Sequence, residues 1–241
     1  DVYKRQIILT TGTGSIFGFL VAREAYSTAI LAPLFIVMSL LYGTAVYYLI
    51  LRLISKYHDT YITTDILDNL KKLSVMFLFA NLYFLGLYHV TNMYIAKHLD
   101  FEIFILSSGG IYTLSFWVGQ VFIGIILPMI ILSSNKLCTH LALTMSSILI
   151  LIGSFIAMYV IIIGGQAYPL TIFPDHIIID SSFFDNVVHS YVPSVYEFGL
   201  GIGGVALALI IVLVGIANFK FLPTMISSLH KKEADKKSSD S

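Results

Sequence analysis

The chain has 241 residues, of which 57% are hydrophobic and only 12% are charged, and its formal net charge is zero. A water-soluble domain usually carries about twice that fraction of charged residues, so the composition excludes an ordinary soluble globule and favours a protein embedded in a lipid bilayer. The zero net charge gives no sign of nucleic-acid binding. The single cysteine, Cys138, excludes a disulfide framework and a cysteine-ligated iron–sulfur cluster within this chain.

The N-terminal region differs from the rest of the chain. Residues 1–6 resemble the in-frame translation of a sequencing adaptor, and we interpret them as a scar. The natural chain would then start earlier, and its N-terminal part would be missing. The stretch 7–22 contains Gly12, Gly14 and Gly18, and it is short for a membrane span and flexible for a helix. It is either the stump of a cut helix or a re-entrant segment.

Uncharged stretches define the membrane spans of the remaining chain. Each is longer than the roughly 20 residues that a helix needs to cross the hydrocarbon layer. The sequence therefore predicts an all-α fold, a polytopic transmembrane helix bundle with about five spans and a partial N-terminal segment, within a domain over 7–225. The predicted spans lie near 28–51, 73–95, 110–133, 141–163 and 198–219.

Lysine and arginine predict the orientation, because cytoplasmic ends of spans are enriched in both. One side has only Arg23 and Lys97, so we expect it to be extracytoplasmic in a cytoplasmic membrane. The long 165–194 loop belongs to that side, and the tail 226–241 is expected to be disordered and cytoplasmic. The lysines and arginines of the expected cytoplasmic side are Arg52, Lys56, Lys71, Lys72, Lys136, Lys220, Lys231, Lys232, Lys236 and Lys237.

Polar residues within spans are costly in lipid and often functional. On the second span Asn81, Tyr88 and Asn92 share one helical face, with His89 beside them. Because His89 is the only one of the seven histidines within a span, no facing pair of haem ligands exists, and no haem is expected in this fragment. Ordinary hydrogen bonds between helices would explain the same residues.

On the third span Tyr112, Phe116 and Gln120 share a face, and Trp117 is adjacent. The alternation of spans places these residues at the lysine-poor end. Aromatic, amide and histidine side chains suit an uncharged amphipathic ring such as a quinone, although an aromatic belt at the membrane interface has the same composition. The candidate site residues at this end are His89, Arg23, Asn92, Tyr112, Trp117, Gln120 and Gln166.

Three blocks of sequence, taken in order, resemble a known family. They are Gly14-Ser15-Ile16-Phe17-Gly18 with Ala22-Arg23 and Tyr42-Gly43-Thr44-Ala45, then His89-Val90-Thr91-Asn92-Met93-Tyr94 with Gly109-Gly110-Ile111-Tyr112 and Phe116-Trp117-Val118-Gly119-Gln120, and finally Ile163-Gly164-Gly165-Gln166-Ala167-Tyr168-Pro169. Together they cover roughly residues 10–170 and are similar to the NrfD/PsrC family of polysulfide-reductase-type membrane subunits.

This resemblance implies two four-helix bundles, of which the chain would hold the C-terminal part. Such subunits anchor an iron–sulfur, ferredoxin-like protein and a molybdopterin or multihaem catalytic subunit. They exchange electrons with membrane menaquinone or ubiquinone and usually carry no redox metal. One departure is Met158, where the family leads us to expect an arginine before the Gly-Gly-Gln motif.

The leading hypothesis is a quinone-interacting subunit of a respiratory oxidoreductase, whose metal centres lie on partner subunits. His89 would accept a proton, because histidine titrates near neutral pH. Arg23 and Gln166 would hydrogen-bond the quinone carbonyls, while Tyr112, Trp117, Gln120 and Asn92 would line the ring site. The alternatives are a polytopic transporter and a structural membrane anchor without a quinone site.

Overall fold

The computed structural model describes residues 2–21, 23–57, 62, 64–134, 139–169 and 193–218, and within these ranges its regular structure is entirely helical. The elements in chain order are α1 (Val2–Gly18), α2 (Leu31–Tyr57), α3 (Thr64–Tyr94), η1 (Ala96–His98), α4 (Leu99–Ile103), η2 (Phe104–Ser108), α5 (Ile111–Leu114), η3 (Ser115–Ile126), α6 (Leu127–Ser133), α7 (Thr139–Met158), η4 (Tyr159–Gly164), α8 (Gly165–Ala167) and α9 (Val195–Asn218).

Five helices of the described residues are long and apolar enough to cross a membrane, which confirms the predicted fold class. Two of these spans are composite, because α5, η3 and α6 form one continuous helix and α7, η4 and α8 form another. The helix α3 begins at Thr64, earlier than the predicted 73, because its first turns carry Asp65, Asp68, Lys71 and Lys72 and extend the helix beyond its apolar part.

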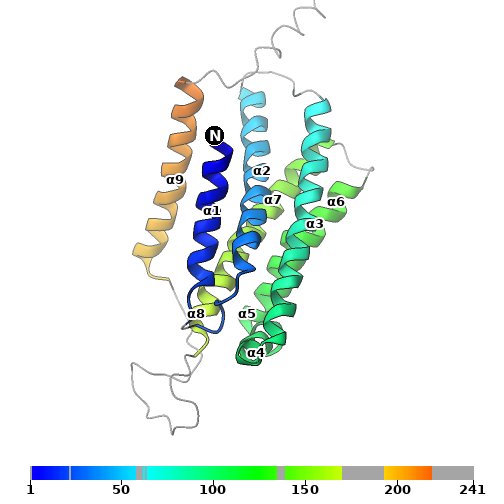
Figure 1. Cartoon of the computed structure of the whole chain (residues 1–241). Helices are drawn as coiled ribbons and strands as arrows, with labels where there is room; N and C mark the ends of the chain where they lie inside the picture. The colour runs from blue at the N-terminus through cyan, green and yellow to red at the C-terminus, as the bar shows by residue number, and fades with distance from the viewer. Residues whose placement is uncertain are drawn as a thin grey trace, which may run out of the picture. The chain divides into compact units, whose positions relative to one another are not determined.

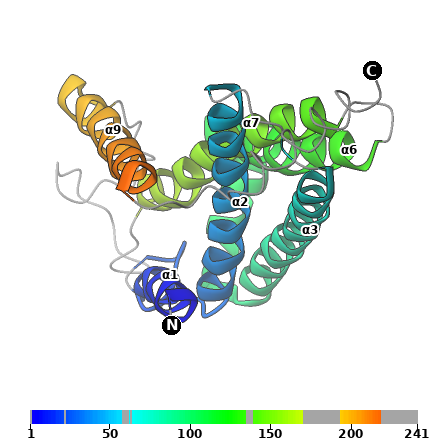
Figure 2. The same cartoon turned by 90° about the horizontal axis from the view of Figure 1, so that it is seen from above.

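The stretch 7–22, for which the sequence left two alternatives, is mostly the helix α1. Its glycines permit close packing, since a Cβ on Gly14 would lie 2.7 Å from the Cα of Ala32 and one on Gly18 would lie 2.9 Å from the Thr28 carbonyl oxygen. The helix α2 lies between α1 and α3 in both views (Figures 1 and 2). The interpretation of residues 1–6 as a scar stays a prediction.

Two composite helices cross at glycines. A Cβ on Gly153 of α7 would lie 2.2 Å from the Cα of Gly124 in η3, so the two backbones touch there. The segment η3 is a π-helix that ends directly before α6, in which Pro128 is one of the first two residues. Proline lacks an N–H and clashes with the carbonyl four residues earlier, and the wider π turn accommodates both.

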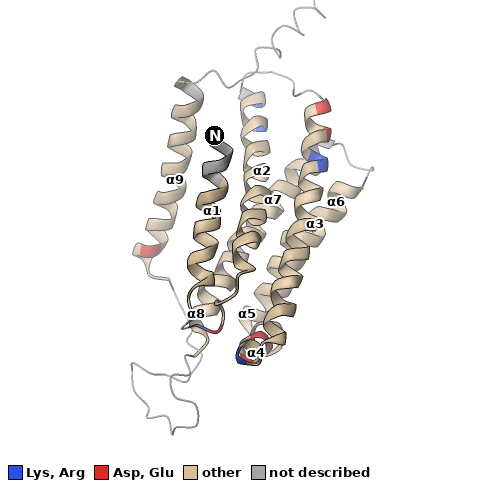
Figure 3. Ribbon diagram, viewed as in Figure 1, with Lys and Arg blue, Asp and Glu red and all other residues tan. Residues whose placement is uncertain are grey.

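Within α2 the charged residues lie near its C-terminal end and within α3 near its N-terminal end, and the rest of each helix carries none (Figure 3). Arg52, Lys71 and Lys72 mark one end, and Lys97 lies at the other, where its Nζ is 3.5 Å from the Val21 carbonyl oxygen. This distribution agrees with the predicted segregation of lysine and arginine, as far as the described residues reach.

The chain forms two compact units, Asp1–Leu53 with Thr64–His189 and Ile54–Thr63 with Ser190–Ser241. In the second unit a capping box starts α9, because Ser194 and Glu197 exchange hydrogen bonds between side chain and backbone N–H. Most of the predicted loop 165–194, all of the tail 226–241, Lys136 and the lysines from Lys220 onward lie outside the described residues.

Candidate functional site

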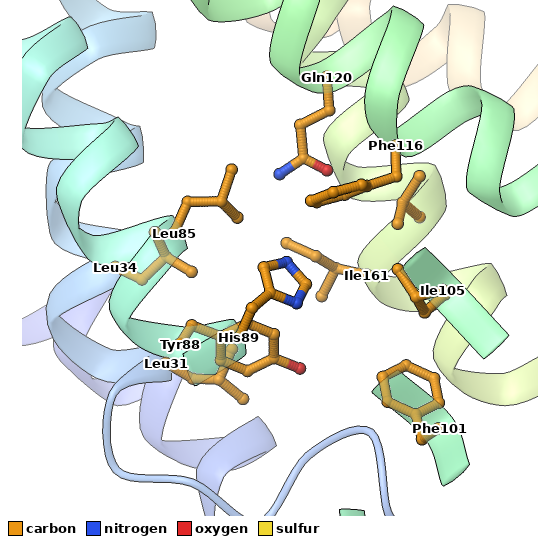
Figure 4. Close-up of a pocket in the computed structure, with 11 residues that line it drawn as sticks. Leu31, Leu34, Leu85, Tyr88, His89, Phe101, Ile105, Phe116, Gln120 and Ile161 are labelled. Carbon is orange, nitrogen blue, oxygen red and sulfur yellow. The ribbon is translucent and has the colours of Figure 1, made fainter. Parts of the chain in front are cut away.

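A small cavity lies in the first unit near the end of α3. Residues of α2, α3, α4, η2, η3 and η4 line it, and Tyr88, His89 and Gln120 provide its polar groups (Figure 4). The space that the centre of a water molecule can occupy is about 20 Å³, which suits a water molecule or two. A quinone ring would fit only after side chains move.

His89 reaches this cavity from the last turns of α3. Its ring packs edge-on against Phe116 of η3, with 4.7 Å between ring centroids. Its Nδ1 lies 2.6 Å from Oε2 of Glu102, a carboxylate on α4 that is only 1% exposed. A histidine and a buried carboxylate therefore form a hydrogen-bonded pair at the wall of the cavity.

The pair continues into a buried polar network. Nδ2 of Asn92 donates to Oε1 of Glu102 at 2.9 Å, and Nδ1 of His98 lies 3.3 Å from Oδ1 of Asn92. Asn92 and His98 are both buried. Because buried polar groups are stable only when hydrogen-bonded, this network fixes the orientation of the Glu102 carboxylate.

Gln120 faces His89 across the cavity. It comes from η3, and its amide points into the same space as the imidazole (Figure 4). Its Oε1 is buried and has no hydrogen-bond partner among the described residues. A buried amide without a partner is costly, so Gln120 offers unused hydrogen-bonding capacity to a ligand or to water.

The predicted contacts of Arg23 and Gln166 take another form. Nη1 of Arg23 donates to the backbone oxygens of Gln166 at 3.0 Å and of Tyr168 at 3.1 Å. The Gln166 side chain is exposed, and neither residue lines the cavity. The structure thus joins the two motifs, but through backbone carbonyls that tie the segment before α2 to the end of α8.

Two tyrosines add further hydrogen bonds at the same end of the first unit. The Tyr26 hydroxyl donates to the carbonyls of Ile161 and Ile162 in the π-helix η4, and the Tyr88 hydroxyl donates to the Ala25 carbonyl at 2.6 Å. The segment 19–30 therefore covers the lysine-poor end of the first unit, and this cover holds Tyr88 at the cavity wall.

The remaining predicted residues lie apart from the cavity. Tyr112 is buried and stacks on Tyr159, with 5.7 Å between ring centroids. Trp117 is half exposed, and its Nε1 donates to the Leu106 carbonyl at 3.0 Å. Of the predicted set, His89 and Gln120 line the cavity, and Asn92 is connected to His89 through Glu102.

Charged groups beyond the network set the electrostatics of this end. Burial raises the pKa of Glu24 above its ordinary value, Asp100 raises it further, and Lys97 opposes both. Burial lowers the pKa of His98, as does Lys97, while Glu102 acts in the opposite direction. His98 is therefore neutral at neutral pH. No group of three or more potential metal ligands occurs in the part of the chain that the structure describes.

Glu102 is the residue that sequence-based reasoning missed. Its position close in sequence to Asn92 and His89 was the available signal, because a short turn after α3 is enough to fold it back onto both.

Comparison with known proteins adds the family. The profile described as "Polysulphide reductase, NrfD" matches residues 5–169. The chain is 30% identical, over 225 residues, to a protein of Archaeoglobus fulgidus named "Hdr-like menaquinol oxidoreductase integral membrane subunit". The match covers 90% of this chain but 55% of that relative, so the chain spans about half of its length. No solved structure matches the chain significantly.

Proposed function

This chain belongs to the polysulphide reductase NrfD family, and we propose that it acts as the quinone/quinol-interacting membrane subunit of a respiratory oxidoreductase. In this role it passes electrons between the membrane quinone pool and an iron–sulfur, ferredoxin-like partner. A molybdopterin or multihaem subunit then provides the catalytic centre. The relative from Archaeoglobus fulgidus, whose name specifies menaquinol, favours menaquinone over ubiquinone as the substrate.

The observation that carries this proposal is the cavity between α3 and η3. Oxidation of a quinol releases two electrons and two protons, so a quinol site needs a base beside the ring oxygen. His89 supplies that base, and Gln120 offers an amide on the opposite wall. Phe116 supplies an aromatic face for the ring. The narrow space implies that a quinol enters by displacing side chains.

The π-helical segments support the same location. The segments η2, η3 and η4 all contribute to the cavity wall. Such segments are rare in proteins and are frequently found at functional sites. Here they place Phe116, Gln120 and Ile161 around His89.

Quinol turnover by two histidine variants tests the proposal. In membranes that contain the complete complex, we expect His89→Gln to lower the rate of quinol-dependent reduction of an artificial acceptor by about 100-fold, the usual contribution of a general base. The matched control is His140→Gln, because His140 lies at the opposite end of the bundle, where its carbonyl accepts from Tyr48. Equal quinol turnover in both variants would exclude this cavity as the site.

A further inference from the structure

Glu102 is a buried carboxylate whose hydrogen bonds go to uncharged donors. It is 1% exposed and contacts Nδ1 of His89 and Nδ2 of Asn92. The two nearby cations are engaged elsewhere, since Arg23 donates to backbone carbonyls and Lys97 approaches another. A buried negative charge is costly unless a positive charge forms beside it. The group placed to become positive is the His89 imidazole.

The contact also determines which nitrogen of His89 is free. An ionised carboxylate only accepts hydrogen bonds, so beside an ionised Glu102 the nitrogen at 2.6 Å, Nδ1, carries the hydrogen. The other nitrogen, Nε2, keeps its lone pair and is the one able to take a proton. A carboxylate bonded to one nitrogen of a histidine fixes the tautomer and the orientation of the ring.

We propose that Glu102 is the positioning residue that makes His89 the base for quinol oxidation. The proposal rests on the proposed function. As the quinol O–H bond breaks, its proton bonds to Nε2 of His89, while the hydrogen on Nδ1 stays bound to the ring and hydrogen-bonded to Glu102. The imidazolium and the carboxylate then form a neutral pair. The electrons pass to the iron–sulfur partner, and the second proton passes to water.

Among the described residues, Glu102 is the charged group that contacts His89 directly. The cavity residues from α2, η2, η3 and η4 carry no ionisable side chain. Tyr88, the neighbour on α3, donates to a carbonyl, and His98 on η1 is neutral and contacts Asn92. The other charged residues of this end, Arg23, Glu24, Lys97 and Asp100, do not line the cavity.

The test compares Glu102→Gln with Asp100→Asn in membranes that contain the complete complex. Both variants remove a carboxylate from α4, but Asp100 is exposed. We expect Glu102→Gln to lower the maximal rate of quinol oxidation by about tenfold or more. The pH–rate profile of this variant should also differ from that of the wild type, because the carboxylate no longer fixes the tautomer of His89. Asp100→Asn should keep the rate and profile of the wild type.

A purely structural role predicts a different result. In that case Glu102→Gln lowers the rate equally at every pH, and the profile does not move, which would refute the assignment of Glu102. Glu102→Asp keeps the charge on a shorter side chain. This variant should keep the pH–rate profile of the wild type at a reduced maximal rate. If the wild-type complex oxidises no quinol, the proposed function itself fails, independently of Glu102.

Infrared difference spectra of the wild-type complex provide the readout if these variants do not assemble. Addition of quinol should change imidazole bands toward the protonated ring while the carboxylate bands persist. Quinol oxidation without a change in the imidazole bands would overturn the proposal.

Discussion

Alanine at Gly153 tests the glycine crossing that positions both walls of the cavity. Its Cβ would lie 2.2 Å from the Cα of Gly124 and 3.0 Å from its nitrogen. Overpacking costs about 1–3 kcal/mol, and the upper value applies here because the opposing atoms are backbone. Replacing a glycine within a helix by alanine stabilises the folded state by about 0.5–1 kcal/mol. The net destabilisation is therefore about 2 kcal/mol, or about 4–8 °C in the melting temperature of a chain of this size.

The assay is the melting temperature of the purified protein in detergent. Gly119→Ala should have a smaller effect, because its Cβ would meet only the Ile156 side chain, which can move. Gly86→Ala is the control, since no atom lies within 4 Å of its Cβ position, and its melting temperature should not fall. Equal melting temperatures for Gly153→Ala and Gly86→Ala would show that the two helices do not touch at this point.

Three further variants probe the candidate site. Gln120→Leu removes a buried amide oxygen that has no partner among the described residues, so we expect the melting temperature to hold or rise while the KM for quinol increases. Burial lowers the pKa of His98, so the unfolded chain binds more protons than the folded one below about pH 6.5. The wild-type protein therefore loses stability as the pH falls from 7 to 5, and the variant His98→Gln should lose less thermal stability over the same range. Arg23→Met breaks the bonds to the carbonyls of Gln166 and Tyr168 and should cost about 1–2 kcal/mol after allowance for partial exposure, measured by detergent melting; an unchanged midpoint would contradict this.

The membrane spans were predictable because lipid imposes a single strong rule. Charges end each span, and this rule located all five helices from the uncharged stretches alone. This rule does not locate helix ends that extend beyond the apolar part of a span, as the early start of α3 at Thr64 shows. The π-helical segments also escaped it. The segment η3 accommodates Pro128 and packs against the distant helix α7, and no periodic pattern in the sequence expresses such contacts.

The site was predictable only where one helical face carried the signal. The shared face of Asn81, Tyr88 and Asn92 is buried, and so is that of Phe116 and Gln120. Periodicity along one helix gives no distances between residues of different spans, however. It therefore could not distinguish side chains that line the cavity from those that pack between helices elsewhere. Arg23 and Gln166 do meet, but the meeting involves the Gln166 backbone, whose position a motif cannot reveal.

Under the proposed function, the position of the polar network indicates where protons from a quinol would go. His89, Glu102, Asn92 and His98 are connected toward the end that holds Arg23 and Lys97. In the opposite direction the cavity walls are apolar apart from Gln120. Under the orientation predicted from lysine and arginine, that polar end faces away from the cytoplasm. Protons taken up by His89 would then leave on the outer side, and quinol oxidation would add to the proton gradient.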